Sequence, residues 1–322
     1  MGRRRARGRS GTGALGSVGL VVVGLFVSSR AHAFCRTRTC EFNSEVVCPV
    51  DALTGCSTQG AFVYWGSSCL SYAVQRDGSV AQGISAEQVS GLLAQGFRTW
   101  SELPCPGGGS PELAAASQGL IACGDVEYNC LAGDANSNLV SFRDQFNDDP
   151  LGLRRGVIAL TTITANLRTG EIFDADIELN SRDEAFTLID STTLGERNLH
   201  GVINHELGHL LGLSHTKERG ALMDALYEGT TEPGQDDTAG ICQALPRSAA
   251  DPACVIEPLP TDSACLGHDV SCTEVETTAP DSGGCSCREA RTEPGRLGLW
   301  SLGLGLLLLA RGRRSQPAQT VL

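Results

Sequence analysis

The 322-residue sequence has few aromatic residues, few charged residues for its length and only two methionines. Aromatic residues make up 5% and charged residues 19% of the chain, which is typical neither of a coiled coil nor of a charge-rich disordered protein. No segment of about 20 to 50 residues repeats, which argues against solenoids and propellers. Apolar residues, at 41%, are sufficient for the core of one or two domains.

Basic residues are also scarce. Against 37 acidic side chains there are only 25 basic ones, and no basic stripe appears outside the two ends of the chain. A protein that binds nucleic acid normally presents a basic surface to the phosphates, so we expect no nucleic-acid partner. The composition is that of an acidic, glycine-rich globular protein.

Residues 1–33 have the three parts of a secretory signal peptide. Five arginines lie among the first nine residues, an apolar stretch covers 20–27, and Ala31-His32-Ala33 supplies the small residues of a cleavage site. We therefore expect export, with the mature chain beginning at Phe34. The alternative is a basic arm without a targeting role.

All 14 cysteines lie after residue 33, and none falls between 131 and 241. An even number of cysteines in an exported chain favours disulfides over free thiols. The alternative, a zinc ribbon, needs paired C-x-x-C knuckles, whereas the one close pair is Cys285-Ser-Cys287. The spacing alone does not reveal which cysteines pair.

Hydrophobic periodicity in the middle of the chain predicts both helices and strands. Ser85 begins a capping box in front of a helix with one buried face, and a second helix begins near Arg197. A short strand near 70–74 precedes the first helix. Between the helices, the apolar run 157–163 predicts a central strand, and the alternation within 174–180 predicts an edge strand. This order indicates an α/β or α+β fold.

The second predicted helix carries the sequence His205-Glu206-Leu207-Gly208-His209. Residues four apart lie on one helix face, so His205 and His209 are placed to bind one zinc ion. Gly212 can adopt a positive φ, which lets the chain leave the helix and bring His215 back as a third ligand. Three protein ligands leave the fourth position of zinc to water, as in catalytic rather than structural sites.

Glu206 is not a ligand in this interpretation. It is placed to accept a proton from a zinc-bound water, whose pKa the ion lowers toward about 7, and later to give that proton to the leaving nitrogen. A lone histidine is usually an ordinary core residue, but three of the six histidines here stand in one motif. The sequence therefore predicts one catalytic Zn²⁺ as cofactor and a protein or peptide as substrate.

The pattern H-E-x-x-H-x-x-G-x-x-H resembles the metzincin family of zinc endopeptidases. Met223 stands eight residues after His215, as in the methionine turn of the matrixin branch, and Asp236-Asp237 resembles the C-terminal helix of matrixins. The resemblance extends from about Leu70 to Ala244. It implies a metzincin-like α+β fold, with a twisted mixed sheet that has an antiparallel edge strand and packs on two or three helices, one of them the active-site helix above the methionine turn.

The same resemblance suggests where the substrate lies. It places 174–180 at the strand that binds substrate backbone, although this segment has an alternative role as a merely structural edge strand. It places Tyr227 beside the pocket for the residue after the cut. The P-R-C-G-x-P-D segment of the matrixin cysteine switch is missing, and the remaining histidines are too few for the second zinc of matrixins.

A calcium site is a further expectation, with a solvated loop as its alternative. The acidic residues concerned are Asp144, Asp148 and Asp149.

Residues 297–310 form a short apolar block, which Arg311, Arg313 and Arg314 follow. As a helix with a rise of about 1.5 Å per residue, the block reaches about 20 Å, short of the ~30 Å hydrocarbon core of a membrane. With Cys285-Ser-Cys287 in front, it resembles the C-terminal sorting segment on exported proteins of myxobacteria. That resemblance implies processing, or association with the outer membrane or cell surface, and the alternative is a buried terminal helix.

Five segments follow from these patterns: a signal peptide (1–33), a cysteine-rich N-terminal segment (34–69), a zinc metallopeptidase domain (70–250), a spacer rich in Pro, Ser, Thr, Asp and Gly (251–284) and a sorting or anchor segment (285–322). The expected function is that of an exported zinc endopeptidase. The alternatives are a non-catalytic surface binding module with the zinc fold, a hydrolase of non-peptide amides or esters, and an anchored structural protein. Glu206 argues against the binding module, which has no need of this carboxylate.

Overall fold

The computed structural model describes residues 33–42, 47–131, 136–145, 157–189, 195–226, 228–248, 254–267 and 287–288, together with Gly2 and Thr193. The chain divides into two units, Met1–Ala31 and His32–Leu322, and the fold described below is that of the second. Most of the predicted leader and the predicted C-terminal apolar block lie outside the described residues.

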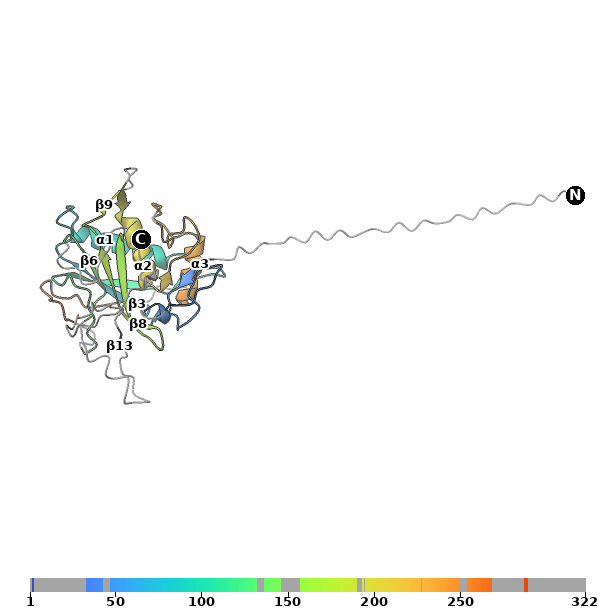
Figure 1. Ribbon diagram of the computed structural model, residues 1–322, viewed down its shortest axis with the longest axis horizontal. Helices are drawn as coiled ribbons and strands as arrows, with labels where there is room; N and C mark the ends of the chain where they lie inside the picture. The colour runs from blue at the N-terminus through green and yellow to red at the C-terminus, as the bar shows by residue number, and fades with distance from the viewer. Residues whose placement is uncertain are drawn as a thin grey trace, which may run out of the picture. The chain divides into compact units, whose positions relative to one another are not determined.

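A mixed seven-stranded sheet forms the centre of the fold (Figure 1). Its strands are β2 (Tyr64–Trp65), β3 (Cys69–Gln75), β5 (Ala114–Ile121), β6 (Leu139–Phe142), β7 (Ala159–Asn166), β8 (Glu171–Leu179) and β13 (Cys287–Arg288). The order is β13-β7-β8-β6-β3-β5, and β2 lies beside the first residues of β8. The strands from β8 to β5 are parallel, whereas β7 is antiparallel to β8.

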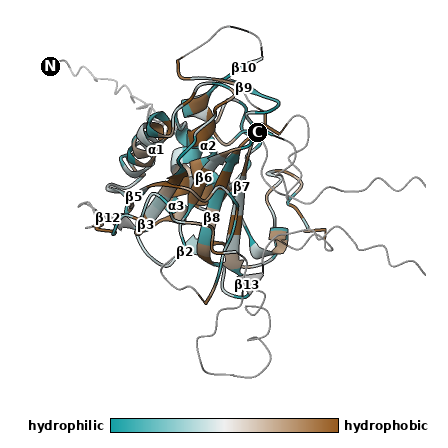
Figure 2. Cartoon of the chain, turned by 90° about the vertical axis from the view of Figure 1, so that its left-hand side faces the viewer, coloured by the Kyte–Doolittle hydropathy of each residue, from teal (hydrophilic) through white to brown (hydrophobic). Residues whose placement is uncertain are grey.

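Three helices complete the α+β fold. Helices α1 (Ala86–Ser101) and α2 (Leu199–Leu210) pack against each other and against the sheet, and α3 (Gln235–Ala244) packs against three short strands outside this sheet. Figure 2 shows apolar residues concentrated in α2 and in the strands beside it. The hydroxyl of Ser85 and the side chain of Gln88 form the predicted capping box of α1. The predicted fold class is confirmed.

Three pairs of short strands lie outside the main sheet. They join β1 (Cys35–Arg36) to β11 (Leu213–Ser214), β4 (Ser110–Pro111) to β12 (Arg247–Ser248), and β9 (Ala185–Thr187) to β10 (Glu196–Asn198). The 3-10 helix η1 (Thr39–Phe42) follows β1.

The predicted position of 174–180 is wrong, and that of 157–163 is met only in part, because β7 lies between β13 and β8 but pairs with β13 only at its end. The segment 174–180, expected at an edge, lies inside the sheet, because β8 pairs with β6 on one side and with β7 on the other. The run 157–163, expected to be central, contains the first part of β7, which over 159–164 pairs only with β8 among the described residues. The segment 174–180 was expected at an edge because its acidic residues alternate as on an exposed strand, whereas in the structure they are buried.

These buried acidic residues are held by hydrogen bonds and by each other. Asp174 and Asp176 are 2% and 1% exposed. Asp176 accepts hydrogen bonds from the backbone N–H groups of Glu127 (3.0 Å) and Leu139 (2.7 Å). Burial first, and then the neighbouring Asp176, raise the pKa of Asp174 well above its usual value, and burial also raises the pKa of Asp176. The pair therefore keeps a proton at a pH where free Asp is ionised.

Five disulfides join described cysteines, as expected for the cysteine pattern. They are Cys35–Cys56, Cys40–Cys48, Cys69–Cys254, Cys105–Cys242 and Cys123–Cys265. The last three connect partners 137 to 185 residues apart. A crosslink that closes so long a loop restricts the unfolded chain and stabilises a domain by about 2–5 kcal/mol.

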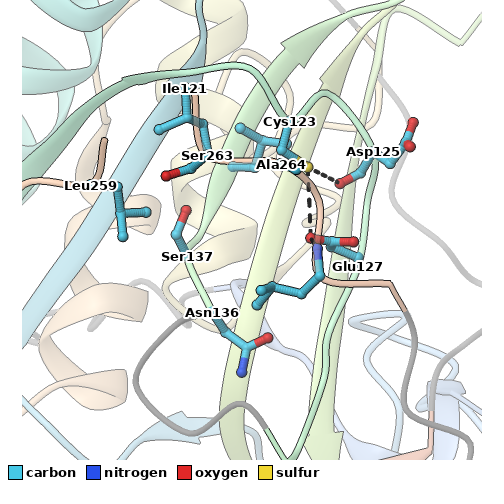
Figure 3. Close-up of a pocket in the computed structure, with 11 residues that line it drawn as sticks. Ile121, Cys123, Asp125, Glu127, Asn136, Ser137, Leu259, Ser263 and Ala264 are labelled. Carbon is cyan, nitrogen blue, oxygen red and sulfur yellow. Dashed lines mark hydrogen bonds between the residues drawn. The ribbon is translucent and has the colours of Figure 1, made fainter. Parts of the chain in front are cut away.

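A cavity of about 280 Å³ lies between the loop after β5 and residues 259–266 (Figure 3). Asp125 and Glu127 are its acidic lining residues, and Glu127 accepts hydrogen bonds from the backbone N–H groups of Leu266 and Gly267. The side chain of Asn136 bonds to the backbone of Asn129 at 2.8 Å. The bonds of Glu127 therefore join the two segments that form the walls, whereas those of Asn136 lie within the loop after β5. No helix among the described residues has the length and apolarity to span a bilayer.

We expect Asp174→Asn to stabilise the protein at neutral pH, by about 1 kcal/mol. A carboxyl whose pKa is raised on folding contributes stability that is complete below its ordinary pKa and is lost as the pH rises through its folded-state pKa. Asn stays neutral and can donate to Asp176. Urea unfolding from about pH 4 to pH 9 should therefore show a smaller loss of stability with rising pH in the variant than in the parent.

Asp77→Asn is the control, because the side chain of Asp77 is 61% exposed. This variant should keep the pH dependence of the parent. An Asp174→Asn protein that is less stable than the parent throughout the range would contradict the shared-proton interpretation.

Candidate metal centre

Three imidazoles converge at the end of α2. Nε2 of His205 lies 2.9 Å from Nε2 of His209 and 3.3 Å from Nε2 of His215. His205 and His209 are 0% and 1% exposed, and His215 is partly exposed. The geometry thus brings together the three ligands predicted from the sequence.

The second ring nitrogen, Nδ1, of His205 and of His209 forms a hydrogen bond with a backbone carbonyl. Nδ1 of His205 donates to the carbonyl of Leu222 at 2.6 Å, and Nδ1 of His209 donates to that of Leu213 at 2.8 Å. A carbonyl only accepts, so in both rings Nδ1 carries the proton and Nε2 presents its lone pair to the centre. Nitrogen ligands about 2.1 Å from a tetrahedral zinc ion lie about 3.4 Å apart, so the cluster fits zinc.

The histidines are also in the protonation state that binds metal. Burial lowers the pKa of His205 to about 3 and that of His215 to about 4. Burial, followed by the neighbouring histidines, lowers the pKa of His209 as well. All three rings are therefore neutral at neutral pH, and no proton has to leave before a metal binds.

Glu206 lies beside the cluster with one oxygen held and the other free. It is 0% exposed, and its Oε2 accepts a hydrogen bond from Oγ1 of Thr161 on β7 at 2.5 Å. Its Oε1 has no partner among the described residues. Burial raises the pKa of Glu206 to about 8, although the bond from Thr161 acts in the opposite direction. A cation at the histidines would favour the carboxylate form.

Gly212 makes the turn that the sequence predicts. Its φ is +96°, a conformation that side-chain-bearing residues rarely adopt, and its N–H donates to the carbonyl of His209 at 2.8 Å. The chain then reverses into β11, which ends directly before His215.

Met223 lies beneath α2, as the spacing predicts, and is 2% exposed. Asp237 of α3 holds this turn, because its carboxylate accepts the backbone N–H groups of Leu222 (2.8 Å) and Met223 (3.0 Å). A Cβ on Gly208 would lie 2.3 Å from Sδ of Met223 and 3.1 Å from Cζ2 of Trp100. The glycine therefore permits a close approach between α2, the methionine turn and α1.

The other residues predicted from the sequence are Tyr227 and the three aspartates of the expected calcium site. Tyr227 lies outside the described residues, as do Asp148 and Asp149 of the predicted calcium cluster. Asp144 accepts hydrogen bonds from the hydroxyls of Ser79 (2.7 Å) and Ser181 and from the N–H of Ala81 (3.0 Å).

Two contacts of the site were not predicted. Thr161 belongs to an apolar run, where its hydroxyl is the only signal of a polar role, and Asp237 acts across 14 residues on the methionine turn.

A narrow cavity of about 10 Å³, room for about one water, lies beside His205. Its other lining residues are Gly201, Ala221, Leu222, Asp224, Leu226, Glu228 and Thr230.

Comparison with known proteins agrees with this geometry. Residues 138–245 match the family model of matrixins. The chain is 28% identical over 180 residues to an interstitial collagenase of Sus scrofa, which covers 55% of this chain and 32% of that protein. It is 43% identical over 63 residues to an interstitial collagenase of Oryctolagus cuniculus, which covers 19% and 13%. The chain spans a third or less of these relatives, and residues 138–245 are similar to the matrixin family.

We expect Gly208→Ala to destabilise the protein by roughly 1–3 kcal/mol, because the added methyl group overlaps Met223. Gly91→Ala is a matched control. Gly91 is an exposed residue of α1, and its added Cβ would meet nothing within 4 Å. This substitution should stabilise by about 0.5–1 kcal/mol through helix propensity. Urea unfolding of both metal-free variants measures the difference, and equal effects would refute the close contact.

Proposed function

We propose that the protein is an exported zinc endopeptidase, with His205, His209 and His215 as ligands and Glu206 as general base and acid. The observation that supports this best is the convergence of three imidazole nitrogens, those of His209 and His215 lying 2.9 and 3.3 Å from that of His205. The next residue after His205 is the buried Glu206, whose Oε1 has no partner among the described residues. The matrixin match over 138–245 supports the same activity.

The chain's own groups have distinct tasks in this reaction. A zinc ion bound here supplies a Lewis acid for the scissile carbonyl and lowers the pKa of the attacking water. Oε1 of Glu206 is free to accept the proton of that water, while Oε2 stays bonded to Thr161. The same carboxyl then delivers the proton to the leaving nitrogen, which breaks the peptide bond. Thr161 orients the carboxylate throughout.

The alternative of a non-catalytic binding module is less well supported. A module that only binds zinc gains nothing from a buried carboxyl group, whose burial without a full set of partners is unfavourable. Glu206 is fully buried, directly follows His205, and keeps one oxygen without a partner among the residues that the structure describes. Such an arrangement is useful when a water has to be deprotonated there.

Export and surface attachment are part of the proposal. The five disulfides support an oxidising compartment, since crosslinks of this kind rarely persist in the cytosol. Residues 1–33 resemble a leader, and residues 285–322 resemble a sorting segment. Together they support secretion, followed by processing or by retention at the cell surface or outer membrane.

We expect Glu206→Gln to keep about one zinc per chain and to lose turnover by roughly 10²–10⁴-fold, because the amide cannot accept the proton of water. Zinc content by atomic absorption and hydrolysis of casein measure the two properties, with intact disulfides. Glu87→Gln, at an exposed position on α1, is the control and should match the parent. A fully active Glu206→Gln protein would rule out this mechanism.

Removal of a histidine ligand should lower zinc content as well as activity, unlike Glu206→Gln. We expect His205→Ala, His209→Ala or His215→Ala to lose zinc and activity together. His200→Ala is the matched control, because His200 lies on the same helix but its Nε2 is 3.2 Å from Nδ2 of Asn204 and not in the cluster. If the parent contains zinc and a ligand variant retains it at equal affinity, that residue is not a ligand.

A further inference from the structure

We propose that Thr37, in the cysteine-rich segment near the start of the chain, is a positioning residue for the metal ligands His209 and His215. This inference rests on the proposed zinc site. Thr37 lies outside the region 138–245 that matches the matrixin family model, and no motif in the sequence points to it.

The first argument concerns the carbonyl groups at the end of α2. The last carbonyls of a helix have no partner within the helix and must find donors elsewhere. Nε1 of Trp65 donates to the carbonyl of Leu210 at 2.8 Å, and the N–H of Thr37 donates to that of Gly212 at 3.0 Å. The N-terminal segment therefore caps the C-terminal end of the zinc helix.

The second argument concerns the carbonyl of Leu213, which has two donors. Oγ1 of Thr37 donates to it at 2.9 Å, and Nδ1 of His209 donates to it at 2.8 Å. A carbonyl oxygen has two lone pairs, so the two hydrogen bonds are compatible. The hydroxyl of Thr37 thus holds the carbonyl of Leu213 in place, and this carbonyl in turn orients the ring of His209.

The third argument concerns His215. It follows β11 directly, and β11 pairs with β1 so that Cys35 lies opposite Ser214. On the other side of His215, Oγ1 of Thr216 donates to Asp236 of α3 at 2.8 Å. The N-terminal segment therefore holds the backbone that leads into the third ligand, and α3 holds the backbone that follows it.

The disulfide Cys35–Cys56 anchors this arrangement, because it ties β1 to the loop that precedes β2. Groups that orient a metal ligand commonly change metal affinity by about 10–100-fold when they are removed. A merely structural threonine would change the stability of the fold without a specific effect on the metal.

Zinc affinity of the full chain, with intact disulfides, tests the proposal. Thr37→Val keeps the shape of the side chain but removes the donor, and we expect zinc binding to weaken about 10–100-fold in competition with a chelator. The absorption spectrum of the Co²⁺ form should also change, because the ligand geometry relaxes. Thr37→Ser keeps the hydroxyl and should restore both properties.

Thr39→Val is the matched control. Thr39 is 6% exposed, close to the 7% of Thr37, and its Oγ1 accepts from the N–H of Ala61 within the segment. This variant should bind zinc like the parent even if the fold becomes less stable. Equal losses of affinity in Thr37→Val and Thr39→Val would indicate general destabilisation and overturn the proposal.

Two further outcomes separate this inference from the proposed function. If the parent binds no zinc, the proposed function fails. If the parent binds zinc, and Thr37→Val has the same affinity and the same Co²⁺ spectrum, the inference alone fails. Should Thr37→Val not fold, Cys35→Ala/Cys56→Ala is compared with Cys40→Ala/Cys48→Ala. The first pair anchors β1 and should weaken zinc binding more, and the reverse order would overturn the proposal.

Discussion

The structure depends on one constraint: lone pairs of neutral histidines must point to one place, although nothing in the histidine rings themselves favours such convergence. The carbonyls of Leu222 and Leu213 impose it by accepting Nδ1–H of His205 and His209. Each carbonyl is held in turn by a distant part of the chain. Asp237 holds the turn that contains Leu222, and Thr37 bonds to Leu213. The metal centre is therefore supported by α3 on one side and by the N-terminal segment on the other.

Packing between the helices brings the same parts together. Nε1 of Trp100 in α1 donates to the carbonyl of Asn204 in α2 at 3.0 Å. A Cβ on Gly96 would lie 2.6 Å from Cδ1 of Leu207, so a side chain at that position would separate the two helices. The sheet adds Thr161 from β7, which reaches the carboxylate of Glu206. Every layer of the fold thus contributes one contact to the site, and none of these contacts is local in sequence.

This distribution explains what was predictable. The approach of His205 and His209 to each other follows from helix periodicity, and the turn at Gly212 from local backbone preferences. The capped start of α1 is equally local. The edge position of 174–180 was mispredicted because Asp174 and Asp176 alternate as on an exposed strand, while the backbone donors to Asp176, at Glu127 and Leu139, lie 49 and 37 residues away. Thr37 acts on a carbonyl 176 residues along the chain, a contact that no spacing rule describes.

The long disulfides have a consequence for the order of assembly. Cys69, Cys105 and Cys123 find their partners only at Cys254, Cys242 and Cys265, at least 137 residues later. Synthesis proceeds from the N-terminus, so these early cysteines must wait until almost the whole domain exists. Contacts between remote parts of a chain also form slowly, because a large loop has to close first. The N-terminal segment likewise meets residues 212–216 only at that stage. A truncated chain, or one still being made, therefore has its histidine motif but not the distant residues that orient the three rings, and these surroundings form late in assembly.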